Sequence, residues 1–380
     1  MKKSKLRKFI LIYLIFLSPN IVRITSEDEG VPNELVTKKN AEIKAQAIVS
    51  EREIRKELGK LERSMEAITQ NAISNHYILG SSVAIYYKRT LAFEVNEVFK
   101  NSTPLSLASV TKPFTSLAIM QLADNGALKL NDPISKYIPE VTKQFPAFDG
   151  KEITIKHLMQ HTSGFPYIGA RPIAAPGTKF MYSNYNYRLL ASIIEKVSGQ
   201  SYANYVKENI FTPLEMEDSM VSQNADGASG IAVSSRNLAN FANLFLGEGK
   251  YGDTSIVQSS KIKKIFKAPE FMPKASQMEF YGLGWRVNRE KNLVKLFYHT
   301  GLWNGIFADL RIMPQNKSFI IQLCNPPSYK SAGFTSYQGQ MHSLAMKYIE
   351  LLEKLPEQPE SELASVNFLE DQEDLFPDAD

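Results

Sequence analysis

A serine followed three residues later by a lysine is the first pattern in this chain that could do chemistry. Ser109 and Lys112 lie within residues 107–115, and the apolar residues after them recur at intervals of three and four. This periodicity predicts a helix with one buried face that begins near Val110. Because positions i and i+3 of a helix are neighbours, the Lys112 ammonium would lie beside the Ser109 hydroxyl at the positive end of the helix. The pair is therefore a candidate activated nucleophile.

The spacing alone is not specific, because Ser-x-x-Lys arises by chance about once or twice in a chain of this size. A second copy, Ser260 with Lys263, lies in a lysine-rich segment that has no partner motif. We interpret this second copy as part of a solvated face. Ser109 must therefore be supported by other residues.

Two further motifs could provide that support. One is a Tyr-x-Asn triplet that follows a proline–glycine turn, and the other is a His-Thr-Gly triplet at the end of a predicted strand. The residues are Tyr182 and Asn184 in the first motif, and His299, Thr300 and Gly301 in the second.

Each motif has a competing match elsewhere in the chain. Tyr202 and Asn204 repeat the Tyr-x-Asn spacing, but they lie in a predicted helix whose apolar face favours core packing. His161 begins a His-Thr-Ser-Gly run at residues 161–164, which follows a predicted helix instead of ending a strand. Tyr182 and His299 are therefore the preferred candidates.

A zinc site is the alternative chemistry that the histidines could support. His157 and His161 are four residues apart, as in zinc hydrolases, but such sites also need a glutamate directly after the first histidine. Position 158 is a leucine. A short helix that closes into a glycine turn explains the stretch, and we expect neither a metal nor another cofactor.

The composition of the chain excludes several kinds of partner and site. The formal net charge is only +4 and no basic–aromatic patch is present, so nucleic acid is not an expected partner. Cys324 is the only cysteine, which excludes a disulfide framework and a thiolate metal site. It lies in an apolar run that predicts a buried strand.

The ends of the chain differ in character from its middle. A basic start and an apolar run at residues 9–17 predict that residues 1–25 are a signal peptide or an uncleaved N-terminal anchor. The protein is then exported, and it is periplasmic, secreted or attached to a membrane by its N-terminus. Residues 26–75 read as an amphipathic helical segment, and the acidic, proline-containing residues 355–380 as a disordered tail.

Residues 76–354 carry the pattern of one catalytic domain. Two paired strands between residues 80 and 96 precede a helical block, and several strands between residues 281 and 324 follow it before a last helix. This order predicts an α+β fold, in which both ends of the chain complete an antiparallel sheet flanked by terminal helices. A helical subdomain at about residues 113–265 is inserted into it.

Taken together, the three motifs resemble the serine β-lactamase and penicillin-binding protein superfamily. The chain is most similar to the class C β-lactamase-related group, which also holds D,D-peptidases, D-aminopeptidases and esterases. The resemblance runs from about Gly80 to Asn325 and implies a β-lactamase/transpeptidase-like fold. It also covers connecting stretches at residues 158–164, 176–178 and 281–285.

The resemblance implies a role for each motif residue. Ser109 would attack a carbonyl and form an acyl-enzyme, with Tyr182 as the base if Lys112 stabilises its phenolate. Asn184 would hold Lys112 and an amide of the substrate. The backbone N–H groups of Ser109 and Leu302 would form the oxyanion hole. Thr300 and Gly301 would bind substrate, and Trp303 and Tyr185 would be either pocket walls or core residues.

The sequence departs from the β-lactamase pattern at position 299, where class C β-lactamases have lysine. Histidine is largely neutral at pH 7, whereas lysine is a permanent cation suited to a substrate carboxylate. This difference favours cleavage of a small ester or a D-amino-acid peptide. A β-lactamase or penicillin-binding D,D-carboxypeptidase is the alternative, and a catalytically silent domain that binds cell-wall peptide is a further one.

Overall fold

The structure is a computed structural model of the whole chain, and it describes residues 33–146, 150–272, 278–291, 293–303 and 305–356. The predicted signal peptide or anchor at residues 1–25 and nearly all of the predicted acidic tail lie outside these ranges. The chain divides into two compact units, one of residues 60–349 and one of residues 1–59 with 350–380. Every motif residue named above belongs to the first unit.

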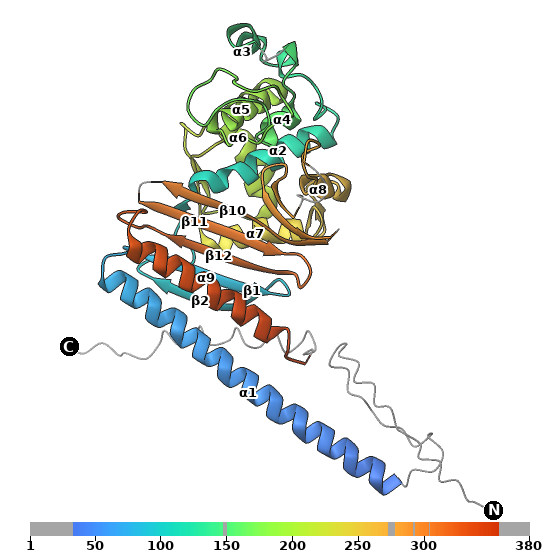
Figure 1. Cartoon of the computed structure of the whole chain (residues 1–380), viewed down its shortest axis with the longest axis vertical. Coiled ribbons are helices and arrows are strands. Elements are labelled where there is room, and N and C mark those ends of the chain that lie inside the picture. Colours follow the sequence, from blue (N-terminus) through green and yellow to red (C-terminus); the bar gives the residue numbers. More distant parts are fainter. Residues whose placement is uncertain (1–32, 147–149, 273–277, 292, 304, 357–380) are drawn as a thin grey trace, which may run out of the picture. The chain divides into compact units, whose positions relative to one another are not determined.

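A seven-stranded antiparallel sheet forms the centre of the 60–349 unit (Figure 1). Its strand order is β2-β1-β12-β11-β10-β9-β8, so the first and last strands in the sequence pair with each other. This pairing confirms the prediction that both ends of the chain complete one antiparallel sheet. The strand bounds are β1 Ser81–Tyr87, β2 Thr90–Glu97, β8 Glu279–Tyr281, β9 Arg286–Glu290, β10 Leu293–Trp303, β11 Ile306–Met313 and β12 Ser318–Cys324.

Strand β12, an interior strand of the sheet, shows why the sheet needs a layer on each face. All of its residues are buried, including Gln322 and the free thiol of Cys324. A strand buried on both faces loses the alternation of apolar and polar residues that marks a half-exposed strand. The sequence run around Cys324 is continuous and apolar for this reason.

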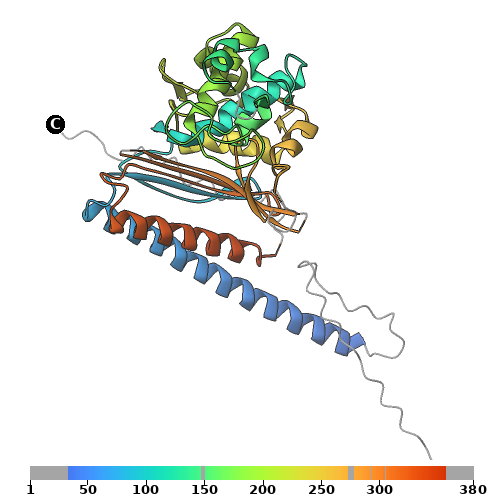
Figure 2. The ribbon, with the colours of Figure 1, turned by 45° about the horizontal axis from the view of Figure 1, so that its top comes forward.

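Within the 60–349 unit, the end of α1 (Asn33–Ser74) and most of α9 (Ala332–Leu352) lie on one face of the sheet (Figure 2). Buried residues of α9 recur at intervals of three and four, as in a helix with one apolar face. Phe334 contacts Phe307 of β11, and the Tyr348 hydroxyl donates to Glu62 of α1 at 2.6 Å. Of the helices in the described ranges, none is long and apolar enough to cross a membrane.

The opposite face carries the inserted subdomain, which is mainly helical. Its longest helices are α2 (Thr111–Asp124), α5 (Asn184–Ser198) and α7 (Ser235–Leu246). The shorter ones are α3 (Pro139–Gln144), α4 (Ile155–Met159), α6 (Tyr202–Val206) and α8 (Ser259–Ile265). Short strands join the segments: β3 (Leu105–Ser106), β4 (Met220–Val221), β5 (Ile231–Val233), β6 (Lys250–Tyr251) and β7 (Thr254–Ser255).

Helix α2 begins next to the predicted residue, Val110, but it is more buried than predicted. It begins at Thr111, directly after a turn of 3₁₀-helix, η1 (Ala108–Val110), that contains Ser109. It is also buried around most of its circumference, whereas the sequence predicted one buried face. Polar residues of α2 are therefore enclosed together with apolar ones, and Lys112 is among them.

Candidate active site

Ser109 and Lys112 meet at the start of α2. The Lys112 Nζ donates to Ser109 Oγ at 2.9 Å and to the carbonyl oxygen of Ala228 at 3.1 Å. The Lys112 side chain is completely buried, while Ser109 is half-buried. Ala108 before the serine has a φ of +44°, an uncommon conformation for a residue with a Cβ atom. Such strained turns are concentrated at functional sites.

Burial changes the proton affinity of the Lys112 amine. Desolvation lowers the pKa of Lys112 from 10.5 to about 7, and it outweighs the attraction of the Asp226 carboxylate. The Arg188 guanidinium lowers this pKa further. Because a pKa near the working pH suits proton transfer, the amine can accept a proton from the Ser109 hydroxyl at neutral pH.

Tyr182 lies on the other side of the serine, just before α5. Its ring centroid is 5.0 Å from Lys112 Nζ, and its hydroxyl is hydrogen-bonded to Ser109. Burial raises the pKa of Tyr182 to about 12, although the Ser109 hydrogen bond and the Arg286 charge oppose this rise. The phenol therefore keeps its proton at neutral pH. These pKa shifts favour Lys112 as the base, in contrast to the sequence-based interpretation, which gave that role to Tyr182.

Asn184 is the first residue of α5, but it does not hold Lys112 in this structure. The hydrogen bonds of the Lys112 amine go to Ser109 and Ala228. The buried Asn184 Oδ1 has no hydrogen-bond partner among the described residues. The predicted contact between Asn184 and Lys112 is thus not formed, and the side-chain oxygen stays available to another donor.

His299 lies on β10 and is 2% exposed. Its Nδ1 is 2.9 Å from the Thr300 carbonyl oxygen, and its Nε2 is 3.0 Å from the Tyr281 hydroxyl. Since a carbonyl can only accept, Nδ1 carries the proton and Nε2 accepts from Tyr281. Burial, together with the Lys112 charge, holds the pKa of His299 well below 6.5. His299 is therefore a neutral side chain with both nitrogens occupied by protein groups.

The edge of β10 comes directly against the turn that carries Ser109. Strand β9 pairs with β10 only as far as Tyr298, which leaves the following residues without a strand partner on that side. A Cβ atom on Gly301 would lie 2.1 Å from the Leu107 carbonyl oxygen and 3.0 Å from the Ser109 nitrogen. Only a glycine at position 301 lets the backbone of β10 lie this close to the turn that carries Ser109. Leu302 is the next residue along the same edge, and it is 44% exposed.

His161 is a site residue whose position the sequence did not reveal. Its carbonyl oxygen accepts from the Met181 N–H at 2.7 Å, and its Nδ1 accepts from the Ser183 N–H at 3.2 Å. These two bonds flank Tyr182, and the rings of His161 and Tyr182 lie 4.3 Å apart. The sequence gives no signal for this arrangement, because the partners are backbone groups about twenty residues away.

Asn186 completes the surroundings of His161. Its Nδ2 is 3.1 Å from His161 Nδ1, so this ring nitrogen accepts two hydrogen bonds and Nε2 carries the proton. Burial holds the pKa of His161 well below 6.5, and the positive charges of Lys112 and Arg286 act in the same direction. A neutral imidazole thus fixes the backbone on both sides of Tyr182.

The competing motifs have structural roles. His157 closes a capping box with Thr154, in which each backbone N–H donates to the other's side chain at 3.2 Å. The Tyr202 hydroxyl is 2.8 Å from Thr115 Oγ1 in the core between α6 and α2. Over the described parts of the chain, no group of three or more histidine, cysteine, aspartate or glutamate side chains could hold a metal ion.

A cavity of about 320 Å³ lies beyond Tyr281, and none of the motif residues lines it. It shares Tyr281, the hydrogen-bond partner of His299, and it also contains Phe180 and the cationic side chain of Arg286. Trp303, a predicted pocket wall or core residue, is 64% exposed, while Tyr185 packs on Phe165 with their rings 5.0 Å apart. The cavity therefore offers aromatic surface, one cation, Arg286, and one carboxylate, Glu279.

Comparison with known proteins places this geometry in a family. The family model described as Beta-lactamase matches residues 61–335. Penicillin-binding protein 4* of Bacillus subtilis is 26% identical over 284 residues, which are 60% of this chain and 61% of that protein. The chain thus spans about three fifths of the length of the curated relatives it matches.

Solved structures share the fold. A D-stereospecific amidohydrolase from Streptomyces sp. has a TM-score of 0.58 at 21% identity, over 71% of this chain and 97% of that chain. EstCE1, a hydrolase with promiscuous acyltransferase activity, has a TM-score of 0.64 at 16% identity, over 76% of this chain and 99% of that chain.

Proposed function

This chain belongs to the beta-lactamase family, and on that basis we propose that it is a serine hydrolase that cleaves an ester or amide through an acyl-Ser109 intermediate. The observation that carries the proposal is the 2.9 Å hydrogen bond between a buried amine and the Ser109 hydroxyl. Because the pKa of Lys112 is lowered to about 7, this amine can act as a base where an exposed lysine could not.

In the proposed reaction, Ser109 Oγ attacks the substrate carbonyl carbon while neutral Lys112 takes the hydroxyl proton. The N–H groups of Ser109 and Leu302 would stabilise the oxyanion, since the edge of β10 lies against the turn that carries Ser109. The bond to the leaving alcohol or amine then breaks, and the leaving group receives the proton, with Tyr182 as the relaying donor. Water next attacks the acyl-enzyme, and its proton passes to Lys112. The bond between the acyl carbon and Ser109 Oγ then breaks, Lys112 returns the proton to Oγ, and the acid leaves.

Two side chains near Tyr182, Arg286 and Asn184, favour a small ester or a D-amino-acid peptide as substrate. His299 is neutral, so Arg286 is the cation in the cavity that could pair with a substrate carboxylate. The buried Asn184 Oδ1, which has no described partner, could accept from a substrate amide. The fold neighbours EstCE1, a hydrolase, and the D-stereospecific amidohydrolase support this class.

A β-lactam substrate is the second candidate. The observation in its favour is the likeness to penicillin-binding protein 4* of Bacillus subtilis. A silent domain that binds cell-wall peptide would keep the same residues without turnover. Export through residues 1–25 also belongs to this proposal, and it would give the protein access to cell-wall substrates.

The test is a paired assay on the protein without residues 1–25. Release of p-nitrophenol from acetate and butyrate esters is followed beside labelling with a fluorescent penicillin, with Ser109→Ala as the control. We expect ester turnover that Ser109→Ala lowers about a thousandfold or more, with little penicillin labelling. Stable labelling at Ser109 would instead favour a penicillin-binding peptidase. Rapid loss of the label, together with destruction of the drug, would favour a β-lactamase. Ester turnover that survives Ser109→Ala would refute the proposal.

A further inference from the structure

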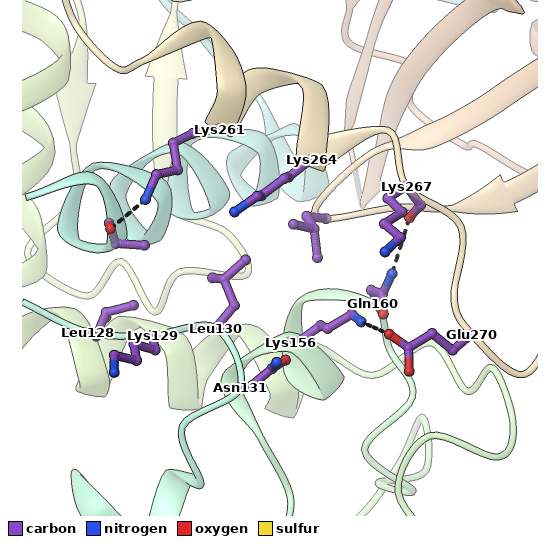
Figure 3. A pocket seen from close by; sticks show the side chains of 12 residues that line it. Leu128, Lys129, Leu130, Asn131, Lys156, Gln160, Lys261, Lys264, Lys267 and Glu270 are labelled. Atoms are coloured by element: carbon purple, nitrogen blue, oxygen red, sulfur yellow. Dashed lines mark hydrogen bonds and ion pairs between the residues drawn. The ribbon is translucent and has the colours of Figure 1, made fainter. Parts of the chain in front are cut away.

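A second, larger cavity lies at the other end of α2 from Ser109. It has a volume of about 440 Å³, and the loop at residues 128–131, the C-terminal end of α4 and helix α8 surround it (Figure 3). Its apolar lining includes Leu128, Leu130 and Leu283. At 1.5 Å per residue, Ala123, the residue of α2 that lines this cavity, lies roughly 18 Å along the helix from Thr111. None of the proposed catalytic residues lines it.

Lysines surround this cavity. Lys156 pairs with Glu270 at 2.5 Å, and Lys261 donates to the Ala123 carbonyl oxygen at 2.7 Å. Three further lysine side chains form no hydrogen bond or close ion pair with any described residue. They are Lys129, Lys264 and Lys267.

The positive charge of this cavity exceeds the nearby negative charge. Five lysines line it, and the carboxylates close to them are Glu270, Asp124, which is 3.9 Å from Lys261, and Asp132, which accepts from the Lys129 N–H at 3.1 Å. A concave site lined by one sign of charge over a low-dielectric floor concentrates the electric field and attracts counter-ions. The repulsion among these lysines is a cost of the folded state that a multivalent anion would relieve.

The existing ion pair can be displaced by such an anion. The Glu270 side chain is 77% exposed, while the side chain of its partner Lys156 is only 19% exposed. Ion pairs with an exposed member contribute little to stability, so exchange of the Glu270 carboxylate for a ligand oxygen needs little energy. Lys264 extends toward the space between α8 and the 128–131 loop, while Lys156 points to Glu270 (Figure 3).

We propose that this cavity binds an organic phosphate, with its phosphate oxygens on the lysine amines and its apolar part against the leucines. A phosphate ester carries up to two negative charges on three oxygens in one compact group, so several lysines can contact it at once. The volume is within the range of small-molecule sites. The Ser109 site needs none of these residues, so this binding does not depend on the proposed hydrolase activity.

The test is isothermal titration calorimetry on the full chain at 50 mM salt. Octyl phosphate combines charge with an apolar tail, pyrophosphate supplies charge alone, and octyl glucoside supplies the tail alone. Lys264→Gln/Lys267→Gln removes two cavity charges, and Lys263→Gln/Lys295→Gln removes two exposed charges that do not line the cavity. Circular dichroism confirms that both variants are folded.

We expect octyl phosphate to bind more tightly than pyrophosphate and octyl glucoside not to bind. The cavity variant should lose at least tenfold in affinity and the control variant less than twofold. Equal losses in the two variants, or no binding of either phosphate, would overturn the proposal. Co-sedimentation with phosphatidylcholine vesicles that contain phosphatidic acid distinguishes the two sources of such a phosphate group. If the wild type binds the vesicles and the cavity variant does not, the ligand is a lipid headgroup. If the wild type binds octyl phosphate but not the vesicles, the ligand is a free phosphate ester. Ser109→Ala should bind as the wild type does, whatever the outcome of the ester assay.

Discussion

The chemistry of single residues in this site depends on how completely Lys112 is buried. An exposed lysine is protonated at pH 7 and cannot accept a proton, whereas desolvation brings the pKa of Lys112 to about 7. The same burial raises the pKa of Tyr182 to about 12. One physical effect thus moves the pKa values of the two candidate bases in opposite directions: it makes the amine a usable base, and it keeps the phenol protonated.

The pH dependence of acylation tests this division of roles. With neutral Lys112 as the proposed base, kcat/KM should rise through an apparent pKa near 7 and reach a plateau above it. Lys112→Ala should lower acylation by about a hundredfold to ten-thousandfold and abolish the rise. Tyr182→Phe should lower the plateau while the midpoint stays near pH 7. Stopped-flow acylation with p-nitrophenyl acetate measures both, and a midpoint that moves in Tyr182→Phe would return the role of base to the phenol.

At the scale of elements, His161 ties the turn after α4 to the segment that leads into α5. Its two hydrogen bonds, to the N–H groups of Met181 and Ser183, fix the backbone around Tyr182. His161 itself has a φ of +56°, which asparagine and histidine tolerate better than most residues. It is a positioning residue, because it acts on the site through Tyr182.

Substitution of His161 should therefore change kcat more than KM. His161→Phe keeps a ring but leaves the buried Ser183 N–H without an acceptor, a loss of about 1–3 kcal/mol in the free energy of unfolding. We expect kcat to fall about tenfold to a hundredfold with KM within threefold. His161→Asn, whose Oδ1 takes the place of Nδ1 and which tolerates the backbone angle, should recover much of this loss.

His157→Ala is the matched control for this prediction. It breaks a capping box and should cost about 0.5–2 kcal/mol of stability with kcat unchanged. Steady-state kinetics with thermal unfolding of all three variants separates the two roles. If the losses in kcat simply follow the losses in stability, His161 has only a structural role.

The sequence predicted local features and failed where distant segments meet. The spacing of Ser109 and Lys112 is a property of one helix turn, and Gly199 ends α5 in the left-handed conformation expected of glycine at that position. The apolar period of α2 predicted a single buried face, because periodicity does not report what packs on the other side. The hydrogen bonds of His161 have no sequence signature for the same reason.

The lysine-rich segment around α8 contains one lysine that the sequence predicted correctly and two that it did not. Lys263 is solvated and pairs with Glu248 at 3.1 Å, as the solvated-face interpretation predicted. Lys261 and Lys264 instead line a cavity whose opposite wall, at residues 128–131, is more than a hundred residues earlier in the chain. Local charge pattern cannot distinguish an exposed face from one that a distant segment covers.

At the scale of the whole molecule, the burial of Lys112 links the site to global stability. The unfolded chain has a lysine pKa near 10.5, and the folded protein has one near 7. Below pH 7 both states bind the proton, and the folded state bears the full penalty of a buried charge. Between pH 7 and about 10 only the unfolded state binds it, so the free energy of unfolding rises with pH. The slope contributed by one such group is at most about 1.4 kcal/mol per pH unit.

Comparison of wild type with Lys112→Met by urea unfolding at pH 7, 8 and 9 isolates this contribution. The lowered pKa values of His161 and His299 act below pH 6.5, and the raised pKa of Tyr182 acts above pH 10, so neither interferes in this window. Because methionine carries no charge to bury, Lys112→Met lacks the penalty at every pH. Any stability advantage of the variant at pH 7 should therefore shrink by roughly 2–3 kcal/mol by pH 9. Lys295→Met, at an exposed position, should give a pH-independent difference, and a flat difference for Lys112→Met as well would mean that the amine is already paired or hydrated in the folded protein.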